Sequence, residues 1–124
     1  MQHELAMLFD AYKSSFPEGA AAIASFYLEP CMTARAGVVR VNATLAELTT
    51  LFTEVDRQYR ARGYVRGEYE MLEHRRLGAN AAFATLRWSY KGADGSTIWQ
   101  TTFSYNLYRR DGAWKILVQT LHDE

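Results

Sequence analysis

The segment most informative about the fold is YNLYRRDGAWKI, residues 105–116. Tyr105 and Leu107 alternate with more polar neighbours, and Trp114 and Ile116 resume an alternating pattern after Asp111-Gly112. Aspartate and glycine both tolerate positive φ, so this pair suits a tight turn between antiparallel strands. The stretch therefore predicts a β-hairpin with strands at about 96–109 and 113–122.

Alternation continues toward the N-terminus and predicts two more strands, at about 67–77 and 81–90, separated by glycine-containing turns at 78–80 and 91–95. The short connections favour an antiparallel meander with one apolar face and one polar face. The apolar face is predicted to carry Ala84, Leu86, Trp88, Tyr90, Trp99, Phe103, Tyr105 and Leu107, and the polar face Thr85, Arg87, Ser89, Gln100, Thr102, Ser104, Asn106 and Tyr108.

The first half of the chain has helical periodicity. Leu5, Leu8, Tyr12 and Phe16 predict a helix that ends near Phe16, and the alanine-rich segment 18–28 predicts a second. Segments 31–35 and 38–41 are predicted as short strands. A capping box at 44–47 and a glycine at 63 delimit the best-defined helix, 44–62. This order predicts an α+β fold, in which the three helices pack on one face of a twisted antiparallel sheet.

Composition narrows the function classes. The 124 residues suit a single domain, 1–124, and 48% hydrophobic content supplies one core. Fourteen basic and fourteen acidic residues balance, so we expect neither a nucleic-acid nor a membrane partner. The single cysteine excludes an internal disulfide, and no apolar run reaches the length of a membrane span. These features predict a cytoplasmic protein.

The motif at residues 105–116 resembles the closing hairpin of the nuclear-transport-factor-2-like superfamily, which includes ketosteroid isomerases and polyketide cyclases. Residues 27–31, 37–41 and 60–64, together with the closing Leu121-His122-Asp123, are similar to segments of uncharacterised bacterial members. The element order matches over nearly the whole chain. Within the superfamily, the chain resembles the SnoaL-like and ketosteroid-isomerase-like branch. The resemblance implies a cone in which three N-terminal helices pack on a curved antiparallel sheet around an interior pocket, and a homodimer formed through the outer sheet face.

The resemblance also implies positions for catalysis. The carboxylate base of the isomerases aligns with Ala34 or Arg35, and neither can accept a proton. The partner acid aligns with Asn106, which alternation places on the outer face. Tyr12 falls near the donor tyrosine but also fits the core stripe. Ketosteroid isomerisation by the familiar mechanism is therefore not expected.

Histidines are the remaining acid–base candidates, because imidazole titrates near neutral pH. His74 lies mid-strand and His122 near the end of the last strand, so both are candidate catalytic residues. Solvent exposure is the alternative for each. No spacing typical of a metal site occurs, and no cofactor is implied. Cys31 is either a nucleophile or, more simply, a small core residue.

The function expected from these observations is binding of a small apolar or amphipathic molecule in the interior pocket. A cavity too small for benzene would exclude this expectation. The alternatives are an isomerase, cyclase or dehydratase that uses a pocket histidine or carboxylate, and a homodimeric protein-interaction module. The residues predicted to line the pocket are Tyr12, Tyr27, Cys31, Trp88, Tyr105 and His122.

Overall fold

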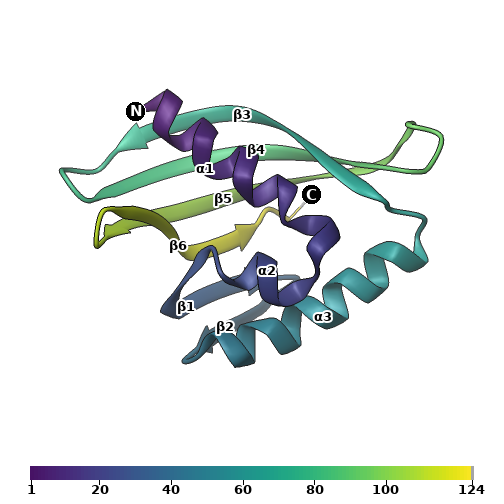
Figure 1. Cartoon of the computed structure of the whole chain (residues 1–124), viewed down its shortest axis with the longest axis horizontal. Helices are drawn as coiled ribbons and strands as arrows, with labels where there is room; N and C mark the ends of the chain where they lie inside the picture. Colours follow the sequence, from purple (N-terminus) through teal and green to yellow (C-terminus); the bar gives the residue numbers. More distant parts are fainter. Residues whose placement is uncertain (124) are drawn as a thin grey trace.

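The computed structural model describes residues 1–123 and places the helices on one face of a curved six-stranded sheet (Figure 1). The helices are α1 (Gln2–Ser14), α2 (Ala20–Ala24) and α3 (Leu45–Ala61), with a short 3-10 helix, η1 (Phe16–Glu18), between the first two. The strands are β1 (Tyr27–Arg35), β2 (Val38–Asn42), β3 (Arg66–Arg76), β4 (Ala81–Lys91), β5 (Thr97–Arg110) and β6 (Ala113–Leu121). The predicted α+β class is confirmed.

The sheet has the strand order β2-β1-β6-β5-β4-β3. Strands β3 to β6 form the predicted antiparallel meander, and Asp111 and Gly112 both have positive φ, 54° and 79°, in its last turn. β1 pairs antiparallel with β2 and parallel with β6, where Thr33 lies beside Gln119. This parallel contact is not predicted by the sequence, and it brings the first and last strands together.

The second helix is shorter than predicted. α2 ends at Ala24, and β1 begins at Tyr27 although alanine-rich sequence favours a helix as far as residue 28. The amide of Ile116 donates to the carbonyl of Phe26, at 2.9 Å, and Tyr27 pairs with Ile116. Sheet pairing with β6 therefore overrides the local helix propensity of these residues.

α3 begins and ends where the sequence predicts. The Thr44 hydroxyl accepts a hydrogen bond from the Glu47 amide at 3.2 Å, and the Glu47 carboxylate accepts one from the Ala43 amide at 2.7 Å. Gly63 follows the helix with a φ of 97°. These caps satisfy amides and carbonyls that a helix end would otherwise leave unpaired. Leu48 and Phe52 then bury the inner face of the helix against the sheet.

The two predicted faces of the meander are confirmed. Ala84, Leu86, Trp88, Phe103 and Tyr105 are all buried toward the helices. The core they form is largely aromatic: α1 contributes rings that pack against those of β4 and β5 at centroid distances of 5.2–6.3 Å. The helical layer therefore lies on the apolar face, and the polar face points outward.

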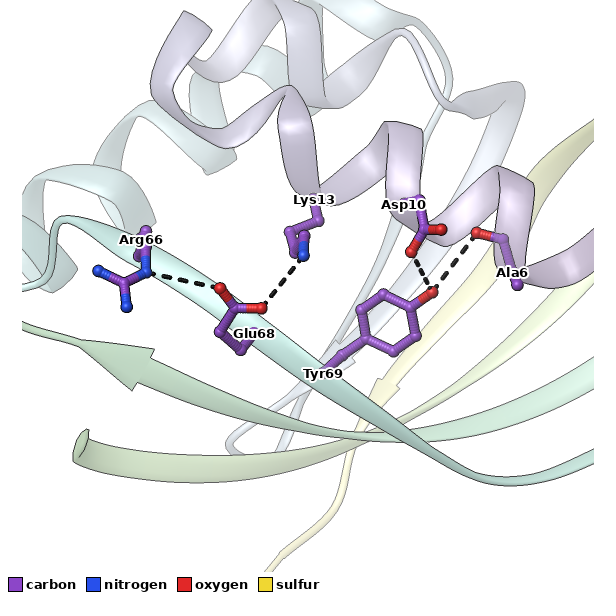
Figure 2. Close-up of polar contacts among 6 residues, drawn as sticks. All are labelled: Ala6, Asp10, Lys13, Arg66, Glu68 and Tyr69. Carbon is purple, nitrogen blue, oxygen red and sulfur yellow. Dashed lines mark hydrogen bonds and ion pairs between the residues drawn. The ribbon is translucent and has the colours of Figure 1, made fainter. Parts of the chain in front are cut away.

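Polar contacts fix α1 across β3 at the edge of the sheet (Figure 2). The Tyr69 hydroxyl donates to Asp10 Oδ1 at 2.6 Å and lies 3.4 Å from the Ala6 carbonyl oxygen. One turn further along the helix, Lys13 Nζ donates to Glu68 Oε2 at 3.1 Å. These contacts hold α1 over the meander, so the rings of its buried face keep a fixed position above the sheet.

A β-bulge in β6 decides which of its side chains face the helices. Ile116 pairs with Leu107 and Val118 pairs with Asn106, so Leu117 has no partner on β5. One extra residue reverses the alternation that follows it. Gln119 consequently faces the core and is buried, whereas His122 is directed to the outer face.

Candidate functional site: an aromatic cleft with a half-buried arginine

A cleft lies between the helices and the inner face of the sheet. Its buried wall is aromatic, with Tyr12 from α1, Trp88 from β4 and Tyr105 from β5. Its lining becomes polar at the half-buried side chains of Arg35, at the end of β1, and Asp56, on α3. Period-two alternation along β1 places Arg35 on the inner face, because Cys31 and Thr33 are buried there.

The cleft is narrow. Its cavity volume is about 70 Å³, and it is partly open to solvent. An engineered apolar cavity of about 150 Å³ holds benzene, and one water molecule takes up about 30 Å³ in the liquid. The space is therefore about half of the volume that holds benzene, and it admits a group of a few heavy atoms. A benzene-sized molecule enclosed in the interior, as expected from the sequence, is excluded in this conformation.

A chain of hydrogen bonds runs from the half-buried arginine into the core. Arg35 Nη1 donates to Gln119 Oε1 at 3.0 Å, and Gln119 Nε2 donates to the Tyr27 hydroxyl at 2.8 Å. The Tyr27 and Tyr12 hydroxyls then share a hydrogen bond of 2.7 Å. Gln119 can join these groups because it lies beside Thr33 on β1 and opposite Tyr105 on β5.

Two phenol protons remain uncommitted in this site. A phenol carries one proton, so the bond between Tyr12 and Tyr27 uses one of their two. Tyr105 accepts a hydrogen bond from Trp88 Nε1 at 2.9 Å, and its own proton has no acceptor among residues 1–123. Burial raises the pKa of Tyr12 and of Tyr105 well above the usual value, so both hydroxyls keep their protons at neutral pH. The core end of the cleft thus offers hydrogen-bond donors.

Arg35 is the other donor group. Its guanidinium lies over the Phe103 ring, 5.4 Å from the centroid, and Nη2 is 3.5 Å from the Tyr59 hydroxyl. No carboxylate among residues 1–123 lies within 4.0 Å of it. The nearby lining carboxylate, Asp56, is ion-paired with Arg60 at 2.9 Å. The side chains in contact with the Arg35 guanidinium, Gln119, Tyr59 and Phe103, are therefore all neutral.

The structure brings together half of the residues predicted for the pocket. Tyr12, Trp88 and Tyr105 line the cleft. Tyr27 lies one layer behind, where it links Tyr12 to the polar chain.

Cys31 is buried beside Asn42, whose Nδ2 is 3.9 Å from Sγ, and burial raises the pKa of the thiol. A core role suits this residue better than a nucleophilic one, because thiolate formation is disfavoured.

The histidines lie elsewhere. His122 Nε2 is 2.7 Å from Ser104 Oγ on the outer face, because the bulge at Leu117 reverses the alternation of β6. His74 is exposed on the edge strand β3. Neither ring is among the residues that line the cleft. Within residues 1–123 there is also no group of three or more His, Cys, Asp or Glu side chains arranged to hold a metal ion.

Arg35 and Gln119 line the cleft, although they are not among the residues predicted for a pocket. A signal for Arg35 exists, because alternation from Cys31 through Thr33 predicts its inner-face position. Gln119 has no such signal, since unbroken alternation from Ile116 would direct it outward. Tyr59 on α3 also lines the cleft, and helical periodicity does not distinguish a core residue from one at the edge of a cleft.

Solved structures with the same fold match almost the whole chain. An NTF-2 like protein of unknown function from Shewanella oneidensis has a TM-score of 0.77 at 17% identity, covering 98% of this chain and 98% of that chain. A domain of unknown function with a cystatin-like fold from Nostoc punctiforme has a TM-score of 0.78 at 11% identity, covering 99% and 76%. An NTF2-like protein with a cystatin-like fold from Novosphingobium aromaticivorans has 0.71 at 15%, covering 97% and 79%. At these identities the likeness shows the fold alone.

The family model and the shared fold identify the class as NTF2-like, the nuclear-transport-factor-2-like proteins, and the resemblance found at residues 105–116 is confirmed at this level. The model of one family, NTF2-like protein (DUF6841), matches residues 3–124, and the chain belongs to that family. A search of functionally curated proteins found no match. None of the helices in the described part of the chain is both long and apolar enough to cross a membrane.

Proposed function

We propose that this domain binds a small amphipathic molecule at the aromatic cleft. The observation that carries the proposal is the combination of a buried aromatic wall with uncommitted hydrogen-bond donors in one partly open space. Ligand sites are concave and largely apolar, with a few polar groups that orient the ligand. The Tyr12–Tyr27 pair and Tyr105 each keep one hydroxyl proton that a ligand can accept in a hydrogen bond.

The volume limits how such a ligand binds. About 70 Å³ admits a head group of a few heavy atoms, so the body of the molecule has to rest on the half-buried side chains around the opening. Tyr59 and Val55 on α3 supply apolar surface there. A larger enclosed ligand would require these side chains to rotate. We therefore propose a head-first binding mode in place of full enclosure.

The experiment is a fragment titration followed through the three tryptophan indole N–H signals by NMR. Trp88 lines the cleft, whereas Trp114 donates to Glu4 elsewhere and serves as the internal control. We expect small acids, alcohols and amides with short apolar bodies to shift the Trp88 signal selectively. Val55→Phe should block this response, and Val39→Phe, at an exposed position, should leave it intact. Equal shifts at all three indoles, or none, would refute the proposal.

The catalytic alternative is less favoured than binding, because His3, His74 and His122 are all absent from the lining of the cleft. The lining carboxylate that remains, Asp56, is paired with Arg60. General acid–base catalysis needs a titratable group within hydrogen-bond reach of the reacting atom. No observation favours such a group over simple binding, so binding is the function we propose.

We also propose that the chain forms a homodimer through the outer face of its sheet. Strand register aligns a lateral row of outward-facing residues across five strands, and the row is mainly apolar: Val41, Met32, Val118, Asn106 and Phe83. Val41 is 68% exposed and Met32 is 38% exposed. A second copy of the same face would cover this row, as the resemblance to the superfamily implies.

Oligomeric state tests the dimer directly. We expect light scattering after size exclusion to give about twice the 14.2 kDa chain mass at micromolar concentration. Val41→Lys, which places a charge in the row, should produce monomers. Val65→Lys is the matched control, because Val65 is exposed but lies outside the sheet. A monomeric wild type, or a Val41→Lys variant that remains dimeric, would contradict this interface.

A further inference from the structure

We propose that the ligand of the cleft is a small carboxylate whose two oxygens bind the guanidinium of Arg35. This inference rests on the proposed function and specifies the chemistry of its ligand. It starts from the charge of the cleft, where Asp56 is already paired with Arg60 and every other lining residue apart from Arg35 is neutral. A half-buried cation without an anionic partner is costly in a protein, and an incoming anion removes that cost.

The hydrogen-bonding capacity of Arg35 is only partly used. A guanidinium has five N–H donors, and this one makes a good bond to Gln119 and a long contact to Tyr59. Its Nε has no partner among residues 1–123. No side-chain nitrogen or oxygen of these residues is both buried and unpaired, so Nε lies where solvent or a ligand reaches it. Adjacent N–H groups are thus available for the parallel pair of bonds that a carboxylate accepts.

The guanidinium is also held in place before any ligand arrives. Gln119 Oε1 faces it because Gln119 Nε2 is fixed by the Tyr27 hydroxyl. The guanidinium carbon Cζ also lies over the Phe103 ring, 5.4 Å from its centroid. A donor fork that is already positioned loses less conformational freedom when it binds a carboxylate. The polar chain therefore acts as the support of an anion site, and not only as core filling.

The uncommitted polar groups at the core end of the cleft and at Arg35 can all donate hydrogen bonds, whereas Asp56 keeps an acceptor oxygen at the polar edge of the cleft. The spare protons of the Tyr12–Tyr27 pair and of Tyr105 are donors, as are the spare N–H groups of Arg35. A ligand that only accepts hydrogen bonds and carries negative charge matches this set. The volume of about 70 Å³ suits a carboxylate group, and a single cation suits one negative charge better than a phosphate dianion.

The test compares charged fragments with neutral isosteres in the full chain. Butyrate is titrated against butyramide, and benzoate against benzamide, with the Trp88 indole as reporter. We expect each carboxylate to bind at least about tenfold more tightly than its amide, as for hydrogen bonds to a charged group. Arg35→Met should remove this preference, and Arg35→Lys should retain part of it because the charge stays and the fork is lost.

The matched control is Arg62→Met, because Arg62 is exposed over the Trp99 ring at 3.7 Å and does not line the cleft. This variant should keep the preference for carboxylates. Equal binding of acid and amide by the wild-type chain would overturn the inference and leave the proposed function standing. Inorganic phosphate that binds as tightly as butyrate, with the same dependence on Arg35, would overturn it in favour of a phosphate site.

Failure of every fragment to move the Trp88 signal would remove the proposed function, and this inference with it. If Arg35→Met does not fold, the preference for carboxylate over amide is measured on Arg35→Lys only. A lysine variant with the full wild-type preference for the carboxylate would then show that paired N–H bonds are not used. That result would overturn the binding mode proposed for the guanidinium.

Discussion

Removing the Tyr27 hydroxyl should destabilise the domain more than removing the hydroxyl of Tyr12. In Tyr27→Phe, Gln119 Nε2 loses its acceptor and Tyr12 loses its partner, and both residues are only 3% exposed. An unpaired buried polar group costs about 1–3 kcal/mol, so we expect a loss of about 2 kcal/mol in the free energy of unfolding. Tyr12→Phe leaves the bond between Gln119 and Tyr27 intact and should cost about 1 kcal/mol.

The double variant sharpens this prediction. With both hydroxyls absent, only Gln119 is left without a partner, so the loss should be about 1 kcal/mol smaller than the sum of the two single losses. Urea unfolding followed by circular dichroism measures all three variants, and a loss of 2 kcal/mol lowers the midpoint by about 1 M. Tyr108→Phe, exposed on the outer face, is the control and should change little. Strict additivity, or equal losses for the two single variants, would show that Tyr27 does not join Tyr12 and Gln119 in one hydrogen-bonded chain.

Three further predictions address the helix cap, the thiol and the phenols. Thr44→Ala should lower the free energy of unfolding by about 1 kcal/mol, since its hydroxyl caps α3 through the Glu47 amide; an unchanged urea midpoint would contradict this. Cys31, 2% exposed and with its pKa raised by burial, should react with iodoacetamide on the order of a hundredfold more slowly in the native protein than in urea; similar rates would show the site to be open. Burial raises the pKa of Tyr12 and Tyr105 above the unfolded value of about 10, so their contribution to stability is complete below about pH 10 and declines as the pH rises further. Absorbance at 295 nm should show these phenols ionising only together with unfolding, and complete ionisation of a folded protein would exclude their burial.

The fold was largely predictable where local signals agree with one another. The Thr44 cap and Gly63 delimit α3, and the glycine turns delimit β3 to β6 within a few residues. The start of β1 was not predictable in this way. Tyr27 follows an alanine-rich helix and joins the sheet only because β6 offers it a parallel partner. Such long-range pairing leaves no periodic trace in the sequence around Tyr27.

The candidate site was predictable only in its aromatic wall. Tyr12, Trp88 and Tyr105 follow from helical and strand periodicity, and each of them lines the cleft. His122 was assigned to the same cavity, but one extra residue at Leu117 reverses its direction. A bulge is invisible to a period-two pattern, because the sequence around it keeps its apolar character. The polar half of the site depends on that same bulge, since it directs Gln119 inward.

The parallel pairing of β1 with β6 has a consequence for the order of folding. β1 at residues 27–35 completes its hydrogen bonds only with a strand at residues 113–121, so the two partners are separated by most of the chain. Closing such a long loop is entropically costly and slows folding. During synthesis on the ribosome, α1, β1 and β2 emerge long before β6. Until β6 has been synthesised, β1 lacks the strand with which it forms its parallel pair. We expect the meander to form first as a template, and the N-terminal third of the chain to settle onto it last.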